Sequence, residues 1–315
     1  MSTFSKTNFK TLNYNSFRPH YPPSFYKILS NYVIKNNGKL PIDQAVDLGC
    51  GTGVATYPLL NFVEKVIGLD LSASMIDTAN SIKLERLKVL DISDSSRISF
   101  KAGSVEDFIN SQDNDIQESS VNLIIAAQCI HWFQNYDLFF KNSAKLLKQG
   151  GTLAYFYYID PRIVNFSGPG KDNRAEVLEK AYAVYDKYVY GDDYIGPYWE
   201  QPGRSILKDF CVETNKHIPR DLYEDVTIET FKASEDTYPN EDKDLDLKKT
   251  SLDIKGYLDY VGTYSGYHNY KETTGKTDLL ENEFLNELLE VTGWDLEKTK
   301  IDLVWNTGYT FVRKK

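Results

Sequence analysis

The 315-residue sequence lacks long hydrophobic runs, has few cysteines and carries no excess of positive charge. Its longest apolar stretches, such as residues 123–127 (LIIAA), are far shorter than the roughly 20 residues that a membrane-spanning helix needs. The first ten residues (MSTFSKTNFK) contain no apolar stretch of the kind found in a secretory signal. We therefore expect a cytoplasmic protein with no membrane partner.

The three cysteines, Cys50, Cys129 and Cys211, are an odd number without C-x-x-C spacing. This pattern argues against a disulfide framework and against a zinc site, so we expect a reducing compartment and no metal. The formal net charge of -9 would repel a phosphate backbone, and no basic run offsets it. We therefore expect a small-molecule partner and no nucleic acid, with the chain acting as a monomer or weak homodimer.

Apolar runs of strand length alternate with helical segments in the first half of the chain. Strands are expected at 44–49, 65–70, 97–102, 121–127 and 152–159, and helices at 24–38 (capped by Ser24), 72–84 and 135–149. After Asp160 we expect helices at 172–190, 203–214, 251–270 and 279–291, strands at 224–231 and 300–312, and a surface loop at 234–250. The alternation predicts an α/β fold: a Rossmann-like, seven-stranded, mostly parallel sheet with helices on both faces and a helical substrate cap.

The segment AVDLGCGTG, residues 45–53, places Gly49, Gly51 and Gly53 between a strand and a helix. Glycines there let the backbone turn tightly and approach a ligand. A dinucleotide site has G-x-G-x-x-G spacing, whereas here the spacing is G-x-G-x-G and Asp47 precedes the first glycine by two residues. That carboxylate would oppose a diphosphate and favour a ligand with an ammonium and a sulfonium, so the expected cofactor is S-adenosylmethionine. Pro58 is expected to shorten or kink the following helix.

The ends of the next three expected strands also carry polar groups. Asp70 ends the second strand, where a carboxylate can accept hydrogen bonds from both ribose hydroxyls. Ser104, Val105 and Glu106 follow the third strand, near the expected adenine ring. The fourth strand is followed by the residues expected over the reacting end: Gln128, His131 and Trp132.

The segments DLGCGTG, GLDLSASMI, GSVEDF and QCIHWF resemble class I S-adenosylmethionine-dependent methyltransferases of the small-molecule branch. YNSFRPHYP, GPYWEQPGR, YSGYHNYK and VWNTGY resemble the fungal trans-aconitate methyltransferase group. The resemblance implies further cofactor contacts from Tyr14, Leu71 and Met75. It also implies one methyltransferase domain over 1–315, in which 1–38 covers the cofactor, 39–159 binds it, and 160–315 supplies the cap and the last two strands.

A carboxylate acceptor is already an anion at neutral pH, so it needs positioning in line with the methyl group and no obligatory general base. Cationic and hydrogen-bonding groups would hold it. The resemblance implies such roles for Arg18, His131, Tyr198, Trp199, Arg204, Tyr264 and His268. Tyr257, Val261, Tyr264 and His268 share one face of the helix expected at 251–270, and such a stripe also fits a core face.

The hypothesis is an O-methyltransferase that forms a monomethyl ester on a small polycarboxylic acid such as trans-aconitate. The same core could instead methylate another small acceptor, namely a hydroxyl, an amine or a toxin. Two alternatives from other classes are a nicotinamide-dependent oxidoreductase and a non-catalytic module that binds the cofactor.

Overall fold

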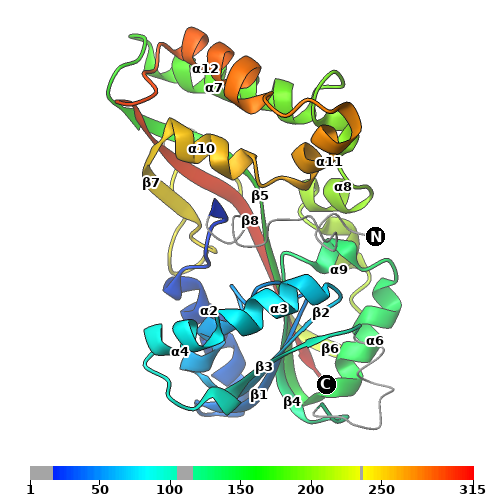
Figure 1. Cartoon of the computed structure of the whole chain (residues 1–315). Helices are drawn as coiled ribbons and strands as arrows, with labels where there is room; N and C mark the ends of the chain where they lie inside the picture. The colour runs from blue at the N-terminus through cyan, green and yellow to red at the C-terminus, as the bar shows by residue number, and fades with distance from the viewer. Residues whose placement is uncertain (1–16, 105–115, 235–236) are drawn as a thin grey trace.

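The computed structural model describes residues 17–104, 116–234 and 237–315, and its centre is one eight-stranded sheet (Figure 1). The strand order is β3-β2-β1-β4-β5-β8-β6, and β7 pairs with β8 beside this path. The strands are β1 (Ile42–Leu48), β2 (Val63–Asp70), β3 (Ile98–Ala102), β4 (Val121–Ala127), β5 (Leu147–Ser167), β6 (Tyr223–Phe231), β7 (Lys248–Asp253) and β8 (Lys300–Lys314). Strands β1 to β5 pair in parallel, whereas β8 runs antiparallel to β5, β6 and β7.

Helices cover both faces of the sheet and form a separate layer above it (Figure 1). The α-helices are α2 (Pro23–Asn37), α3 (Ala73–Ser81), α4 (Lys83–Val89), α6 (Tyr136–Leu146), α7 (Arg174–Tyr190), α8 (Gly203–Lys208), α9 (Val212–Lys216), α10 (Ile254–Val261), α11 (Ser265–Thr274) and α12 (Leu285–Thr292). Shorter helical turns are η2 (Tyr57–Asn61), η3 (Ser95–Arg97), η4 (Ile130–Trp132), η5 (Gly196–Tyr198) and the π-helical η6 (Leu280–Phe284).

The sheet is buried on both faces, which explains its uninterrupted apolar strands. In β1, Ala45 packs into a cluster with residues of α2, α3 and α4, whereas Val46 packs into a second cluster with residues of α6. Both side chains are fully buried. The parallel strands therefore end together at one edge, where the loops that follow them can build a site.

Two long strands connect the core to the cap. Strands β5 and β8 pair from Thr152 and Arg313 in the core to Ser167 and Lys300 in the cap. Figure 1 shows them running upward from the core, with α7, α10, α11 and α12 above. Helices α7 and α12 pack against each other, and the cap buries many tyrosines: Tyr185, Tyr188, Tyr257, Tyr260, Tyr264, Tyr267 and Tyr270.

The Rossmann-like α/β fold is confirmed, with corrections to several elements. The sheet has eight strands instead of seven, because β7 begins within the stretch expected to be a surface loop at 234–250. The helix expected at 251–270 is divided into α10 and α11. Ser24 lies inside α2 and does not cap it, since its hydroxyl donates to Asp246 (3.5 Å) and Pro22 is the N-cap residue. The segment after the glycine loop is the short turn η2 with Pro58 near its start, as expected.

Candidate active site

A cavity of about 820 Å³ opens at the carboxyl ends of the parallel strands. Its walls come from the glycine loop after β1, the ends of β2, β3 and β4, and cap residues 199–207 and 264–265. The volume lies toward the upper part of the range for small-molecule sites, so the cavity can hold a cofactor together with a small second ligand. The site therefore lies between the parallel core and the cap.

The three glycines of the loop are required for two different reasons. All have positive φ, which is strained for other residues. A Cβ on Gly49 would lie 2.7 Å from Cβ of Cys129, and one on Gly53 would lie 2.7 Å from the Tyr57 ring. A Cβ on Gly51 would meet nothing within 4 Å, and Gly51 lines the cavity. Gly49 and Gly53 are thus needed for internal packing, whereas Gly51 leaves room at the backbone for a ligand.

Asp70 connects the glycine loop to the next strand end. Its Oδ2 accepts a hydrogen bond from the backbone N–H of Gly51 (2.9 Å), and its Oδ1 accepts one from Ser72 (2.8 Å). Burial raises the pKa of this carboxyl, while the two backbone donors act in the opposite direction. Asp70 also lines the cavity, so it both shapes the loop and presents carboxylate oxygen to a ligand.

Asp47 lies behind the glycine loop and is fully buried. Its Oδ2 accepts a hydrogen bond from the Thr56 hydroxyl (2.6 Å), whereas its Oδ1 has no hydrogen-bond partner in the described part of the chain. Burial, assisted by the nearby charge of Asp70, raises the pKa of Asp47 to about 7, although the Thr56 hydrogen bond lowers it. Asp47 does not belong to the described cavity lining, so the structure places it beneath the loop and not on the wall expected from the sequence.

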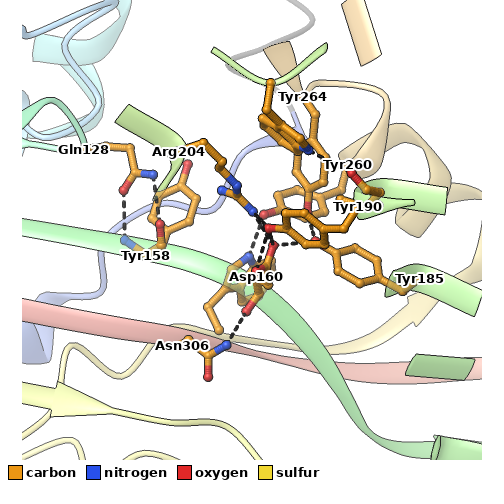
Figure 2. Close-up of polar contacts among 12 residues, drawn as sticks. Gln128, Tyr158, Asp160, Tyr185, Tyr190, Arg204, Tyr260, Tyr264 and Asn306 are labelled. Carbon is orange, nitrogen blue, oxygen red and sulfur yellow. Dashed lines mark hydrogen bonds and ion pairs between the residues drawn. The ribbon is translucent and has the colours of Figure 1, made fainter. Parts of the chain in front are cut away.

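The Gln128 side chain joins the end of β4 to β5 by two hydrogen bonds. Its side-chain amide donates to the carbonyl of Tyr158 (2.9 Å) and accepts from the N–H of Tyr158 (2.8 Å), as Figure 2 shows. Its backbone has φ of +55°, which turns the chain into the cavity wall. Cys129 follows and donates from its buried thiol to the carbonyl of Leu48 (2.8 Å). The β4 end is therefore tied to both neighbouring strands.

His131 and Trp132 lie in η4 and line the cavity. The His131 side chain is buried, and its Nδ1 has no hydrogen-bond partner among the described residues. Burial, together with the charge of Arg204, lowers the pKa of His131 to about 3. The imidazole is therefore neutral at physiological pH, and its Nδ1 lacks a hydrogen bond from the described residues.

Arg204 is held in the cavity wall by the cap. Its Nη2 forms an ion pair with Oδ1 of Asp160 (2.5 Å) and also donates to the Tyr190 hydroxyl. The guanidinium carbon lies 4.2 Å from the centre of the Trp199 ring. Its Nε is buried and has no hydrogen-bond partner in residues 17–104, 116–234 and 237–315. Figure 2 shows the side chains of Arg204 and Tyr190 converging on Asp160.

Arg18 and Tyr264 complete the cavity wall beside the cap. Arg18 donates to the carbonyl of Thr263 (3.1 Å) and to the Tyr158 hydroxyl (3.4 Å), and its guanidinium lies 5.4 Å from the Tyr264 ring centre. The buried Tyr264 hydroxyl bonds to that of Tyr185 (2.9 Å). This part of the wall therefore contains a second guanidinium among tyrosine rings.

The cavity brings together most of the residues singled out in the sequence. Those that line it are Arg18, Gly49, Gly51, Asp70, Leu71, Met75, Ser104, Gln128, His131, Trp132, Trp199, Arg204 and Tyr264. Tyr14, Val105 and Glu106 lie outside the described residues.

Tyr198 and His268 do not line the cavity, which differs from the expectation. Tyr198 packs edge-on against Tyr270, with ring centres 5.3 Å apart. His268 pairs with Glu272 at 3.2 Å. The expected helical face does not continue to His268, because α10 ends at Val261 and α11 begins after Tyr264.

Several cavity features were not identified from the sequence. Glu200, Leu207 and Tyr158 line the cavity, and Asp160 lies directly behind Arg204. Asp160 follows the fifth apolar run just as Asp70 follows the second, so the same rule for strand ends could have indicated it. In the structure, β5 continues through Asp160 into the cap, so Asp160 lies within the strand and not at its end.

Within the described ranges, no three His, Cys, Asp or Glu side chains gather closely enough to hold a metal ion. No described helix combines the length and apolar character needed to cross a bilayer.

Comparisons with known proteins agree with this geometry. Residues 46–155 match a family model described as a methyltransferase domain. The chain is 28% identical over 318 residues to CRG1 of Saccharomyces cerevisiae, named as a probable S-adenosylmethionine-dependent methyltransferase, and the match covers 100% of this chain and 99% of that protein. It is 26% identical over 269 residues to a chain of Dictyostelium discoideum provisionally named a methyltransferase, covering 85% of this chain and 80% of the other.

A solved structure shares the fold. It belongs to a protein of Anaeromyxobacter dehalogenans provisionally named a type II methyltransferase, with a TM-score of 0.58 and 20% identity over 95% of this chain and 97% of that one. The open backbone at Gly51 and the carboxylate of Asp70 on the cavity wall fit a ligand with a ribose and a cationic methyl-bearing end. Together, the matched methyltransferase domain and the full-length relative support a class I S-adenosylmethionine-dependent methyltransferase, with S-adenosylmethionine as its cofactor.

Proposed function

We propose that the protein transfers a methyl group to a carboxylate of a small polycarboxylic acid, such as trans-aconitate, and forms a monomethyl ester. The observation that carries this proposal is a pair of buried nitrogens, Nδ1 of His131 and Nε of Arg204, which have no partner among the described residues and belong to two residues that line one cavity. Buried polar groups are normally hydrogen-bonded, so two such groups on one wall favour a ligand with oxygen acceptors. Arg18 adds a second guanidinium at the same end.

The cofactor would be held by the core. In the proposal, Gly49, Gly51 and Gly53 shape the loop, Asp70 accepts from the ribose, and Leu71, Met75, Ser104 and Gln128 surround the rest. Tyr14 and Val105 stay proposed cofactor contacts from the sequence, and Asp47 acts from beneath the loop. Bound S-adenosylmethionine supplies a methyl group that its sulfonium has already activated, so the chain's own task is to orient the acceptor in line with it.

The acceptor would be held by His131, Trp199, Arg204, Tyr264 and Arg18, whereas Tyr198 and His268 support them from outside the cavity. His131 is neutral, so it can hydrogen-bond an acceptor oxygen without adding charge. A carboxylate needs no proton removed before it attacks, which agrees with a site whose histidine pKa is about 3 and which therefore provides only a weak base. The aromatic walls would exclude water from a reaction that joins an anion to a cation.

The proposed division of the chain follows from these roles. Residues 1–38 would cover the cofactor, 39–159 would bind it, and 160–315 would supply the acceptor side, all within one domain. A cytoplasmic monomer or weak homodimer remains part of the proposal.

The test is incubation with a deuterium-labelled methyl donor and a panel of small mono-, di- and tricarboxylic acids, followed by mass spectrometry of the products. We expect a labelled monomethyl ester of at least one polycarboxylic acid. His131→Gln should lower kcat/KM for that acid at least about tenfold, because a misplaced hydrogen bond disturbs positioning. His217→Gln changes an exposed histidine and is the matched control. Labelled ethers or methylamines without esters would favour the hydroxyl or amine alternative.

A further inference from the structure

Asp160 is a buried carboxylate at the point where β5 leaves the core, and the proposed function gives it no task. The residue is 7% exposed. Its carboxylate accepts hydrogen bonds from the hydroxyls of Tyr185 (2.7 Å) and Tyr190 (2.7 Å) and from Nη2 of Arg204 (2.5 Å). Its backbone carbonyl accepts from Asn306 (3.2 Å) of β8, as Figure 2 shows. The register of β5 against β8 shifts between Tyr158 and Pro161, which frees Asp160 from regular pairing.

Stability alone does not account for this arrangement. Removing two charges from water is costly, and a buried ion pair often contributes no more stability than apolar side chains of the same size. The carboxylate and guanidinium are 9% and 11% exposed, respectively. The main effect of the ion pair is therefore to orient the Arg204 guanidinium.

Contacts hold the Arg204 guanidinium on two sides, whereas its Nε has no hydrogen-bond partner among the described residues. Asp160 and Tyr190 bind its Nη2, and the Trp199 ring covers one face of the guanidinium. Neighbouring Gly203 packs so closely that a Cβ there would lie 2.8 Å from Trp132 and 3.2 Å from the His131 ring. The Nε–H is left without a partner in the described part of the chain, at the wall shared with His131.

We propose that Asp160 is a positioning residue of the acceptor site: it holds Nη2 of Arg204 so that Nε–H stays available to the acceptor, and it cancels the charge of the guanidinium. Arg204 then acts as an oriented hydrogen-bond donor and not as a net cation. This distinction affects the rate, because the negative charge of the acceptor carboxylate and the positive charge of the sulfonium are both lost in the reaction.

The chemical consequence rests on the proposed function. Transfer of the methyl group forms a carbon–oxygen bond to the carboxylate and breaks the carbon–sulfur bond, so an anion and a sulfonium become a neutral ester and a thioether. An uncompensated cation beside the carboxylate stabilises the ground state more than the transition state. Asp160→Asn should therefore lower kcat for the acid at least about tenfold without raising KM. When Arg204→Gln is already present, adding Asp160→Asn should have little further effect.

A second readout does not depend on the acceptor. In a proton–nitrogen correlation spectrum, the Arg204 Nε–H signal can be assigned by its absence from Arg204→Lys. In the full chain bound to S-adenosylhomocysteine, Asp160→Asn should speed exchange of this proton with water at least about tenfold, because the guanidinium loses its anchor. Tyr185→Phe removes another hydrogen bond to Asp160 but leaves Arg204 in contact, so it should leave the exchange unchanged.

The outcomes separate the two proposals. If the wild type esterifies no acid, the proposed function fails and the exchange measurement still tests Asp160. If Asp160→Asn does not bind S-adenosylhomocysteine, Tyr190→Phe replaces it, because the Tyr190 hydroxyl contacts both Asp160 and Arg204. An unchanged exchange rate in a variant that binds S-adenosylhomocysteine normally would overturn the proposal. The same change in Tyr185→Phe would also overturn it, since that result indicates general loosening of the cap.

Discussion

Asp70 is the residue whose carboxylate both shapes the glycine loop and lines the cavity. Asp70→Asn keeps the size of the side chain but removes the charge and one acceptor of the hydrogen bonds from Gly51 and Ser72. Hydrogen bonds to charged groups contribute about 1.5–3 kcal/mol each. We expect the dissociation constant for S-adenosylhomocysteine to rise at least about tenfold by isothermal titration calorimetry.

Asp43→Asn is the matched control for Asp70. Asp43 is an exposed carboxylate in β1 that pairs with Lys148 (2.6 Å), away from the cavity. Its removal should leave the affinity unchanged. Equal affinities for wild type and Asp70→Asn would contradict the role given to Asp70.

The buried carboxyl group of Asp47 leads to a prediction about how the free energy of unfolding depends on pH. Its folded-state pKa is about 7, above the value near 4 of an unfolded aspartate. Between these values the folded chain binds more protons than the unfolded chain, so this group makes stability fall as pH rises, by at most about 1.4 kcal/mol per pH unit. Asp47→Asn cannot titrate and can still accept from Thr56. In urea unfolding, the variant should therefore gain stability relative to wild type between pH values of about 5 and 8. If the free energies of unfolding of the two proteins changed with pH in parallel, the pKa assigned to Asp47 would be wrong.

Single residues also show how much of the candidate site could be predicted from the sequence. The glycine spacing and Asp70 could be predicted because residues at strand ends share an edge of the sheet. The position of Asp47 could not, since only the fold shows that its side chain points beneath the loop to Thr56. The pairing of Arg204 with Asp160 joins residues 44 positions apart on different elements, and no local pattern indicates it.

At the scale of elements, the side chain of Gln128 fastens the end of β4 to β5. Gln128→Ala would leave the N–H and carbonyl of Tyr158 without their side-chain partner. A buried polar group that loses its partner costs about 1–3 kcal/mol, so the free energy of unfolding should fall by about that amount in urea titrations. Gln134→Ala, at an exposed position on the cavity rim, should change it by less than about 0.5 kcal/mol. Equal losses in the two variants would contradict this role.

The elements of the core were predictable because their strands are buried on both faces and read as apolar runs. The cap was less predictable. Residues 248–253 are mostly exposed and polar, and they form β7 only because β8 offers an edge for pairing. The apolar stripe at 251–270 continues across the break between α10 and α11, so the sequence predicted one helix where there are two.

At the scale of the whole molecule, the site is a cavity between the parallel core and the cap, and in the proposed function the cap would hold the acceptor. The strand pair β5 and β8 belongs to both parts, so it fixes Tyr158 and Asp160 relative to the glycine loop. The net charge of -9 does not describe this cavity, because Arg18 and Arg204 both line it. The sequence predicted the class of fold, but the joining of core and cap depends on contacts between distant segments.

Proton release during turnover tests the central claim of carboxylate methylation most directly. A dependence of rate on pH near 7 would be ambiguous, because Asp47 titrates there. By contrast, an ionised carboxylate releases no proton when it is methylated, whereas a hydroxyl or an ammonium group releases one. Protons can be counted with an indicator dye in weak buffer near neutral pH, while S-adenosylhomocysteine is quantified in the same samples. The account predicts methyl transfer without proton release, and one proton released per S-adenosylhomocysteine formed would contradict it.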